Sequence, residues 1–433
     1  MAGPVDLQIL LLLLCVHQCQ GHSNENLYQA KDNLPDYSPS KPTRYLLYDV
    51  NPGEGFNLRR DVYMRVANLV KFLNEDEPWV LVLPPWGRLY HWQSHEIPLQ
   101  SKISWKHFFD INSLALHAPV MEFEDYIKAM GNKVERLFYL QRFKGGWTKW
   151  EEKMEICDCV EEPRYHQLAN GKWRGQFFGY EDFVADKFDC MSTQAYLLTF
   201  KPFLMKNITA RSVFLDRAES MIHGQYSEWS REWWTARRSM VFAKPLRDIG
   251  DKFRKEFLDS DDISDKTELE VWTNMKRNHG DAKGGPYIAL HFRRKDYLYA
   301  HGKEVPSLEI AAKQVLKYLK KYNLKKLFLA TDAPNEEAEE FMNILKKSQI
   351  KTYRYRPSID NLKELKDGGV AIIDQYICAH ARVFIGSYVS TFTFRIHEER
   401  EILGFKQEAT FNRLCGDEEG EECEQPTKWD IKY

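Results

Sequence analysis

Two arginines directly follow a short apolar run in the second half of the 433-residue chain. The run is Tyr287–Leu290, and the segment after it, His291–Asp296, reads HFRRKD. A guanidinium is always charged, and its planar fork of donors matches phosphate oxygens. Because ligands of open α/β sheets bind outside the carboxyl ends of the strands, Arg293 and Arg294 are predicted to hold a phosphate group. A surface charge run after a core strand is the alternative.

A carboxylate between two glycines follows the apolar run Tyr45–Val50 near the N-terminus. Glycines at positions 53 and 55 let the backbone approach a ligand closely. If burial and neighbouring charges raise its pKa, Glu54 would act as a general base towards an acceptor hydroxyl. A turn glutamate in solvent is the alternative interpretation.

Two further positions in the C-terminal part carry groups that bind ligands. Ser390-Thr391 stands between an expected strand and an expected helix, where hydroxyls and backbone N–H groups form an anion site. An ordinary helix cap is the alternative there. Asp374 would accept hydrogen bonds from the amino groups of a purine, with an acid at a helix start as its alternative.

Several well-known catalytic motifs are missing from the sequence. It has no Walker loop, no Gly-x-Gly-x-x-Gly fingerprint, no Ser-centred nucleophile elbow and no His-Glu-x-x-His helix. The Asp-x-Asp pair Asp259-Ser260-Asp261 follows no β-type run, so we expect a solvated acidic loop rather than a metal site. The sequence therefore predicts no bound metal.

Composition and the N-terminal segment restrict the class of protein. A net charge of -2 argues against a general nucleic-acid binder. The apolar run Ile9–Val16 is too short to span a bilayer and indicates a secretory signal peptide, with an uncleaved anchor as the alternative. No membrane span is expected once that segment is removed. Asn207-Ile208-Thr209 is an N-glycosylation sequon, which suits the secretory pathway.

Six of the eight cysteines lie beyond the expected signal peptide. Disulfides are common in an oxidising compartment. Cys415 and Cys423 flank a short acidic loop and are expected to pair. Cys190 is expected to pair with either Cys157 or Cys159, and Cys378 lies in a mostly apolar region typical of a buried thiol.

Alternating strand and helix patterns organise the chain into two α/β arrays around a Trp-rich, irregular middle. Strands are expected at 45–50, 79–83, 287–292, 327–332 and 383–386. Helices are expected after residue 56, after Ser307, over 335–345, over 370–381 and from Thr391. This pattern predicts two Rossmann-like, doubly wound domains that face each other across a cleft. The expected boundaries are 1–21 for the signal peptide, 22–43 for a flexible leader, 44–243 for the N-terminal domain, 244–400 for the C-terminal domain with the donor site, and 401–433 for a tail with a disulfide loop.

Five segments together resemble the protein O-fucosyltransferases, in particular those that modify thrombospondin type 1 repeats. They are HFRRKD, PGEGFN at 52–57, GGVAIID at 368–374, Ser390-Thr391-Phe392, and FRIHEER at 394–400, and the likeness runs from about Arg44 to Tyr433. The resemblance implies a GT-B glycosyltransferase with GDP-β-L-fucose as donor and no required cofactor. It implies Glu54 as catalytic base and Arg293 on the diphosphate, with Arg294 as a structural charge. The implied donor-site residues are Gly53, Gly55, Phe56, Asn57, His291, Phe292, Asp374, Thr391 and Phe392.

The resemblance also implies an acceptor and a compartment. The expected acceptors are folded, disulfide-bonded repeats, fucosylated on Ser or Thr with inversion in the lumen of the endoplasmic reticulum. The related activity towards EGF-like repeats is one alternative. A binding or quality-control protein that retains the fold without turnover is the other. The aromatic group Trp86, Tyr90, His91 and Trp92 is expected to face the acceptor or to pack in the core.

Overall fold

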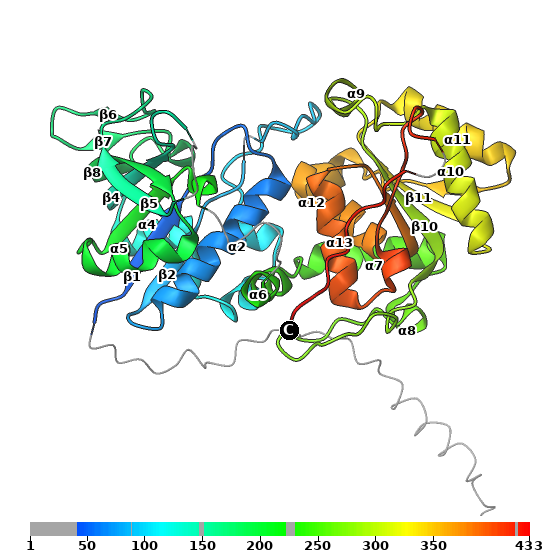
Figure 1. The fold of residues 1–433 in the computed structure, drawn as a ribbon, viewed down its shortest axis with the longest axis horizontal. Coiled ribbons are helices and arrows are strands. Elements are labelled where there is room, and N and C mark those ends of the chain that lie inside the picture. Colours follow the sequence, from blue (N-terminus) through cyan, green and yellow to red (C-terminus); the bar gives the residue numbers. More distant parts are fainter. Residues whose placement is uncertain (1–40, 88, 147–150, 222–229, 421–422) are drawn as a thin grey trace, which may run out of the picture. The chain divides into compact units, whose positions relative to one another are not determined.

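Parallel strands form two separate sheets, the first from residues 44–216 and the second from residues 285–413 (Figure 1). The computed structural model describes residues 41–433 except 88, 147–150, 222–229 and 421–422. The expected signal peptide and most of the expected leader lie outside the described residues. Within the described ranges, no helix is both long and apolar enough to cross a membrane.

The first sheet has the strand order β3-β2-β1-β9-β4-β8-β7-β6, with β5 paired to β8. Its strands are β1 (Arg44–Tyr48), β2 (Trp79–Leu83), β3 (Val120–Glu122), β4 (Lys133–Gln141), β5 (Lys153–Cys157), β6 (His166–Gln167), β7 (Trp173–Arg174), β8 (Val184–Gln194) and β9 (Ser212–Asp216). The pairs from β3 to β8 are parallel, and β5, β6 and β7 pair antiparallel. The predicted parallel βαβ unit of β1, α2 (Phe56–Leu73) and β2 is confirmed.

The prediction of an irregular middle segment is wrong, because β4 and β8 are long strands inside the first sheet. Both carry charged residues that weaken the apolar pattern of a buried strand. Arg136 of β4 forms an ion pair with Asp189 of β8 at 2.7 Å, so these two charges neutralise each other once the strands pair. The sequence of either segment alone does not show that its charged residue has a partner on the other strand.

Helices cover both faces of the first sheet. On one face α2, α5 (Phe200–Lys206) and α6 (Arg231–Ser239) pack against alternate strand residues such as Leu46 and Leu81. On the other face α4 (Phe123–Met130) packs against Leu47 and Val82. The remaining short helices of this half are α3 (Ile111–Ala115) and four 3-10 turns at 105–107, 177–179, 197–199 and 218–220.

The second sheet is fully parallel, with the order β12-β11-β10-β13-β14. Its strands are β10 (Gly285–Phe292), β11 (Lys326–Thr331), β12 (Lys351–Tyr353), β13 (Ala381–Gly386) and β14 (Asn412–Arg413). Strand β14 belongs to the segment 401–433 that was expected to be a tail, so part of that segment completes the sheet.

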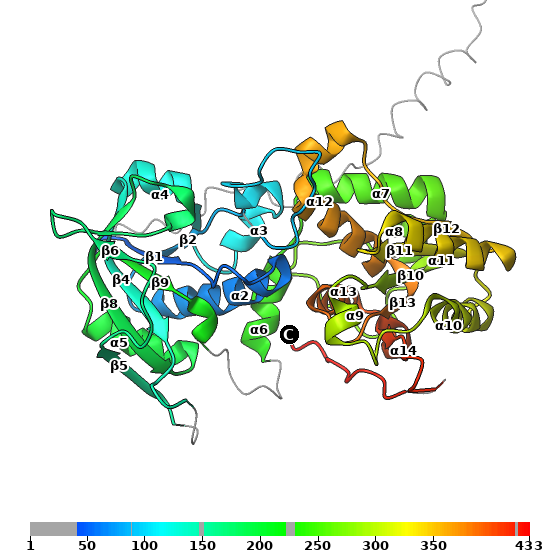
Figure 2. The same cartoon turned by 90° about the horizontal axis from the view of Figure 1, so that it is seen from above.

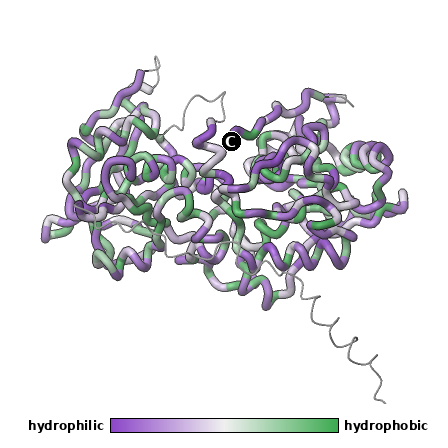
Figure 3. Tube along the Cα trace, turned by 90° about the horizontal axis from the view of Figure 1, so that it is seen from below, coloured by the Kyte–Doolittle hydropathy of each residue, from purple (hydrophilic) through white to green (hydrophobic). Residues whose placement is uncertain are grey.

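Two helix layers sandwich the second sheet (Figure 2). One layer is α7 (Lys244–Leu258), α12 (Ile359–Ala379) and α13 (Thr391–Leu403), which pack against residues such as Ala289 and Phe328. The other is α10 (Leu308–Lys321) and α11 (Asn335–Lys347), which pack against Leu290 and Leu329. Short helices α8 (Asp262–Asp265), α9 (Tyr297–Ala300) and α14 (Gln407–Thr410) lie in the connections. Hydrophobic and hydrophilic stretches alternate along the chain, as expected of helices with one buried face (Figure 3).

Helix α12 begins at Ile359, well before the predicted start at Val370. A kink interrupts it at Lys366, whose φ of 61° lies in the left-handed region. Gly368 follows, and a Cβ there would lie 2.7 Å from the rings of both Trp92 and Phe108. The absence of a side chain at Gly368 therefore lets α12 approach aromatic residues of the N-terminal half. Because glycine has a low helix propensity, it also weakens the sequence pattern that would predict a helix here.

Two disulfides are present among the described residues. Cys415 pairs with Cys423, and Cys190 pairs with Cys159, which resolves the alternative left open by the sequence. Cys378 is a buried free thiol, and Cys157 is a free thiol directly opposite Cys190 in the β5–β8 pair. The sequon residue Asn207 is exposed at the end of α5.

Candidate active site

Glu54 lies in the loop that connects the carboxyl end of β1 to the first turn of α2. Its side chain is half-buried, and this burial, followed by the charge of Glu219, raises the pKa of the Glu54 carboxyl. The Arg59 guanidinium and the Asn51 side chain act in the opposite direction. A carboxyl with a raised pKa beside a helix N-terminus is suited to accept a proton in a reaction near neutral pH.

One guanidinium holds this loop in place. Arg59 donates from Nε to the backbone carbonyl of Glu54 at 3.0 Å and from Nη2 to that of Asn51 at 3.4 Å. Its Nη1 donates to Asp49 Oδ1 at 3.2 Å. Arg59 therefore fixes the backbone that carries the Glu54 carboxyl, a function that the sequence alone did not indicate.

Arg293 follows β10 at the carboxyl edge of the second sheet, as predicted. Its backbone N–H donates to Ser387 Oγ at 2.8 Å, and Ser387 Oγ donates to the His291 carbonyl at 3.1 Å. The guanidinium forms ion pairs with Asp296 at 2.6 Å and with Asp332 at 2.9 Å. A cation held by two carboxylates at a strand end is preorganised to exchange one of them for a phosphate group.

His91 connects Arg293 to the Glu54 loop. Arg293 Nη2 donates to His91 Nδ1 at 3.5 Å, and a Cβ placed on Gly55 would lie 3.4 Å from the His91 ring. Burial and the charge of Arg293 lower the pKa of His91, so its imidazole is neutral and able to accept this bond. The structure therefore brings Glu54's loop and Arg293 to the same imidazole, although they are far apart in the sequence.

The loop that carries His91 is anchored on α12. Asp367 accepts hydrogen bonds from Ser94 Oγ at 2.5 Å and from Gln100 Nε2 at 3.0 Å. The backbone N–H of Asp367 donates to Gln100 Oε1 at 2.9 Å. Of the neighbouring aromatic residues, Trp86 and Trp92 pack on Phe56 in the core, whereas Tyr90 is exposed.

The side chains of Phe56 and Phe292 do not line the site. Phe56 is buried among Trp86, Trp92 and neighbouring rings, and Phe292 packs on Phe341 at 5.5 Å in the core below α10 and α11. Only their backbone groups remain to contact a donor. Gly53 is exposed and Gly55 is half-buried, so both leave their backbone accessible.

His291, Phe392 and Thr391 lie together at the start of α13. The His291 ring stacks on Phe392 with 4.4 Å between centroids, and its Nδ1 bonds to Thr393 Oγ1 at 2.7 Å. Burial lowers the pKa of His291 to about 3, so this imidazole is neutral. Thr391 is exposed, and the N-cap Ser390 makes no side-chain capping bond. The N-terminal amides of α13 are therefore a suitable anion site.

Asp374 lies in the middle of α12, so the alternative of an acid at a helix start is wrong. Its Oδ1 is buried and has no hydrogen-bond partner among the described residues. Burial raises the pKa of Asp374 to about 8, against the opposing charge of Arg354. The next residue, Gln375, donates from Nε2 to Asn57 Oδ1 at 2.9 Å, which joins α12 to α2. An unsatisfied buried carboxyl indicates a ligand that supplies donors.

Arg294 has the structural surroundings expected of it. Its Nε donates to Glu337 at 2.5 Å, its Nη1 to the Pro306 carbonyl at 2.7 Å, and its backbone N–H to Asp332 at 2.6 Å. Arg294 is buried. Of the two neighbouring arginines, Arg293 is therefore the one that contacts His91 beside the Glu54 loop.

One group of side chains in the described ranges has the composition of a metal site. His279, Glu401 and Asp430 place ligand-type atoms within 4.8 Å of one another. The hydrogen bond of 2.7 Å between His279 Nε2 and Glu401 already accounts for much of this arrangement. Asp261 instead caps α8 by accepting from the Ser264 N–H. In the contacts described above, neither the group of His279, Glu401 and Asp430 nor Asp261 touches Glu54 or Arg293.

Two Rossmann-like sheets with reactive side chains on the loops at their carboxyl edges define a glycosyltransferase of the GT-B class. Solved structures of POFUT1 in complex with GDP and with GDP-fucose share this fold. Each has a TM-score of 0.55 and 15% sequence identity, and the matches cover 87% and 86% of this chain and 99% and 98% of those chains.

The family model for GDP-fucose protein O-fucosyltransferases matches residues 45–403. The human protein named GDP-fucose protein O-fucosyltransferase 2 is 50% identical over 394 residues, 90% of each chain. The Caenorhabditis elegans protein of the same name is 44% identical over 431 residues, 98% of each chain. The chain belongs to the GDP-fucose protein O-fucosyltransferase family, and it is a glycosyltransferase.

Proposed function

We propose that this enzyme transfers fucose from GDP-β-L-fucose to Ser or Thr hydroxyls of folded, disulfide-bonded thrombospondin type 1 repeats, with inversion at the anomeric carbon. The observation that carries the proposal is the position of His91, which contacts Arg293 and lies against Gly55 beside Glu54. The proposed base, Glu54, and the proposed phosphate-binding cation, Arg293, thus lie on two sides of the same imidazole. Transfer from a sugar nucleotide requires such a base and such a cation.

In the proposed reaction, Glu54 accepts the proton of the acceptor hydroxyl while its oxygen attacks C1 of fucose. The attack comes from the face opposite the diphosphate, the bond from C1 to the phosphate oxygen breaks, and GDP leaves with the bonding electrons. A β-linked donor then gives an α-linked product. The raised pKa of Glu54 lets it take up a proton at a pH where an exposed glutamate would not.

Arg293 would stabilise the charge that develops on the diphosphate. To do so it would exchange one of its ion pairs, with Asp296 or with Asp332, for phosphate oxygens, which match the fork of guanidinium donors as a carboxylate does. The amides at the start of α13 supply further donors. Such a leaving group needs no strong general acid, so the proposal assigns no metal to the reaction.

Asp374 would recognise the base of the nucleotide. A guanine ring presents neighbouring N–H donors, and the unpaired Oδ1 of Asp374 is an acceptor without a partner. Asn57, which is joined to Gln375, would lie on the same side of the donor. The remaining proposed donor contacts are the backbones of Gly53, Gly55, Phe56 and Phe292 and the side chains of His291, Thr391 and Phe392.

The relatives support the acceptor class. Human and Caenorhabditis elegans proteins that carry the name GDP-fucose protein O-fucosyltransferase 2 match this chain over at least 90% of their length. That name specifies a protein acceptor. The thrombospondin type 1 repeat as acceptor and the inversion at the anomeric carbon are proposed from the sequence resemblance described above.

The decisive experiment measures fucose transfer from GDP-fucose to a folded thrombospondin repeat, a folded EGF-like repeat and a reduced, unfolded thrombospondin repeat. We expect transfer to the folded thrombospondin repeat alone, and an α-linkage by NMR of the product. Glu54→Gln should still bind GDP but lose about 100-fold or more of its kcat. Preference for the EGF-like repeat, or nucleotide binding without transfer, would support one of the two alternatives instead.

We also propose that the protein resides in the lumen of the endoplasmic reticulum. The sequon at Asn207 is exposed, and the structure contains two disulfides. Expression of the full chain in a secretory system should yield an N-glycan on Asn207 that remains sensitive to endoglycosidase H. An unglycosylated Asn207, or loss of sensitivity after transport, would contradict this location.

A further inference from the structure

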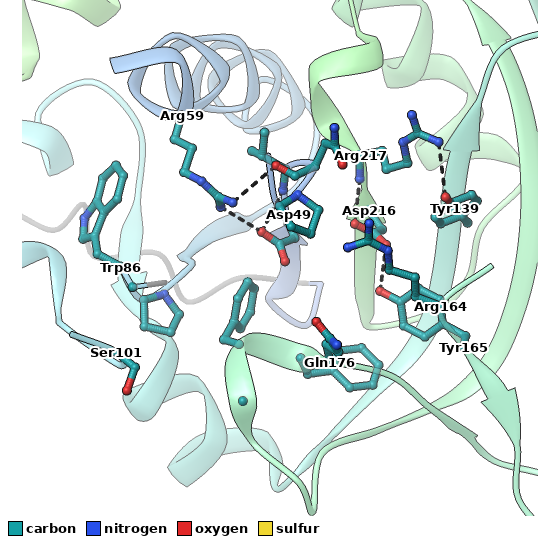
Figure 4. Close-up of a pocket in the computed structure, with 18 of the residues that line it drawn as sticks. Asp49, Arg59, Trp86, Ser101, Tyr139, Arg164, Tyr165, Gln176, Asp216 and Arg217 are labelled. Carbon is teal, nitrogen blue, oxygen red and sulfur yellow. Dashed lines mark hydrogen bonds and ion pairs between the residues drawn. The ribbon is translucent and has the colours of Figure 1, made fainter. Parts of the chain in front are cut away.

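A cavity of about 370 Å³ opens at the carboxyl edge of the first sheet, beside the Glu54 loop (Figure 4). Its wall includes Asn51 and Pro52 of that loop, and its floor includes Asp49 and Asp216. None of the proposed donor-site residues lines it. The cavity is therefore a separate space that shares one loop with the catalytic base.

Asp49 and Asp216 end neighbouring parallel strands. Tyr48 of β1 is paired with Leu215 of β9, so the residues that follow them, Asp49 and Asp216, are next to each other at the sheet edge. Burial, followed by the charge of Asp49, raises the pKa of Asp216 to about 7. Two carboxylates from adjacent strands therefore repel each other on one cavity floor.

Only one of these carboxylates is paired with a cation. Asp49 receives Arg59 Nη1, whereas Asp216 receives the Tyr165 hydroxyl and the Arg217 backbone N–H, each at 2.8 Å. In the described part of the chain no cationic side chain forms an ion pair with Asp216. The Arg217 guanidinium is directed to the Tyr139 hydroxyl at 3.2 Å and to Glu219 at 3.6 Å. Asp49 and Asp216 thus share the floor with the Arg59 guanidinium, and the other basic residues of the lining are Lys102, Arg164 and Arg217.

The walls of the cavity are aromatic. They include Trp86, Tyr139, Tyr165, Phe177 and Phe178. Aromatic faces next to a carboxylate suit a flat cation, since a guanidinium can stack on the rings while it donates to the acid.

We propose that this cavity binds a basic side chain of the acceptor protein, an arginine or a lysine, and so holds the acceptor hydroxyl against Glu54. This inference rests on the proposed function, because it assigns a specificity-determining contact for the same reaction. The bound cation would pair with Asp216, which accepts two hydrogen bonds but has no ion-pair partner among the described residues. It also contacts the loop that Arg59 fixes, which couples acceptor recognition to the position of the base.

Acceptor binding should depend on pH through Asp216, because its ionised form attracts the cation more strongly. The charged and titratable groups around Asp216 are Asp49 at the end of β1, Arg59 on α2, Tyr139 on β4, Tyr165, Arg217 and Glu219 after β9, and Glu161, Glu162 and Arg164 at the rim. The KM for the acceptor should fall as the pH rises from about 6 to about 8.

The test compares wild-type enzyme with Asp216→Asn, using GDP-fucose and a folded thrombospondin type 1 repeat. Asp216→Asn should raise the KM for the repeat about tenfold, because a charge-assisted hydrogen bond is lost. The kcat at saturating repeat and the affinity for GDP should change by less than about twofold. Asp186→Asn, a carboxylate of β8 paired with Lys133 and Lys172, is the matched control and should leave all three values unchanged.

A second set of measurements replaces each arginine and lysine of the repeat by glutamine in turn. One replacement should raise the KM of the wild type about tenfold and have no further effect on Asp216→Asn. The inference is overturned if Asp216→Asn keeps the wild-type KM, or if every acceptor replacement acts independently of it. Lack of transfer by the wild type would instead overturn the proposed function. Thermal unfolding of Asp216→Asn distinguishes a lost contact from a lost fold.

Discussion

Arg293 Nη2 donates to His91 Nδ1 over 3.5 Å, and this contact joins the end of β10 to the loop that follows β2. The same imidazole lies against Gly55, next to the proposed base. In the proposed transfer, Glu54 and Arg293 must keep a fixed separation, since small errors in position cost a large part of the rate. We infer that His91, which contacts both sides, helps to hold this separation.

Replacement of His91 by alanine should therefore slow the reaction more than it weakens donor binding. We expect kcat to fall by about tenfold or more, while the dissociation constant of GDP changes by no more than about threefold. Steady-state kinetics with calorimetric GDP binding will check this. His95→Ala, a change at an exposed histidine of the same loop, should behave as the wild type. Equal loss in His91→Ala and His95→Ala would show that the loop, not the His91 imidazole, matters.

Loss of the Arg59 guanidinium should affect the position of the proposed base, Glu54, and leave donor binding unchanged. Arg59→Gln removes the donors to the carbonyls of Glu54 and Asn51, so the loop loses its fixed position and kcat should drop by about tenfold to 100-fold. GDP affinity should remain close to the wild-type value. Arg65→Gln, on the same helix but bonded to the carbonyls of Glu219 and Met221, is the control for general damage to α2. A pH–rate profile adds a readout that a purely structural loss would not move, because the apparent pKa of Glu54 should shift.

Asp374 should make the empty protein less stable as the pH rises. Its pKa is raised from 3.8 to about 8 in the folded chain, so its contribution to stability is full below pH 3.8 and is lost as the pH rises through 8. Asp374→Asn should raise the melting temperature at pH 8 by a few degrees, with a smaller gain at pH 5. Differential scanning calorimetry at both values, with exposed Asp360→Asn of the same helix as control, tests the sign.

The affinity for GDP should depend on pH in the opposite direction to the stability of the empty protein. If guanine donors pair with the ionised carboxylate, GDP binding expels a proton from Asp374, and GDP affinity should fall as the pH drops from 8 to 6. Asp374→Asn should lose about 100-fold in GDP affinity, because its amide offers a donor where an acceptor is needed. Unchanged GDP affinity in this variant would exclude Asp374 from the nucleotide site.

The sequence predicted the elements whose signal is local. Strands β1, β2, β10 and β11 are buried on both faces and appear as apolar runs, and Glu54 and Arg293 were selected as candidates because each follows such a run. The charged strands β4 and β8 were missed, since the pair Arg136–Asp189 exists only after the strands align. The early start of α12 was missed because Lys366 and Gly368 interrupt its pattern.

Contacts between distant segments account for the rest of the site. His91 meets Arg293 across 202 positions of sequence, and Asn57 meets Gln375 across 318. In the sequence, Arg59 has no feature that distinguishes it from other charged residues of a helix. Its function appears only in the structure, where it donates to the carbonyls of the loop. The cavity floor is equally hidden, because Asp49 and Asp216 become neighbours only through the pairing of β1 with β9.

The free thiol of Cys157 should be able to replace Cys159. Cys157 and Cys190 are directly opposite in the antiparallel pair of β5 and β8, and such positions have Cα separations of about 4.5–5.5 Å, within the range of a disulfide. Cys159→Ser should therefore contain a Cys157–Cys190 bond, detectable by peptide mapping. Cys157→Ser should keep the native bond. A Cys157→Ser, Cys159→Ser double variant, with no bond across its 31-residue separation, should lose about 3–4 kcal/mol of stability.

This arrangement has a consequence for biosynthesis. As β5 aligns with β8, strand pairing presents Cys157 to Cys190, so oxidation would produce a Cys157–Cys190 bond in some molecules in place of the Cys159–Cys190 bond of the finished protein. Conversion to the native bond then requires attack by the Cys159 thiolate on the Cys190 sulfur, which releases Cys157 as a thiolate, and the rate of this intramolecular exchange rises with pH and with access to a disulfide isomerase. The yield of active enzyme from a cell would thus be set by the capacity of the compartment to reshuffle one bond, before any substrate is encountered.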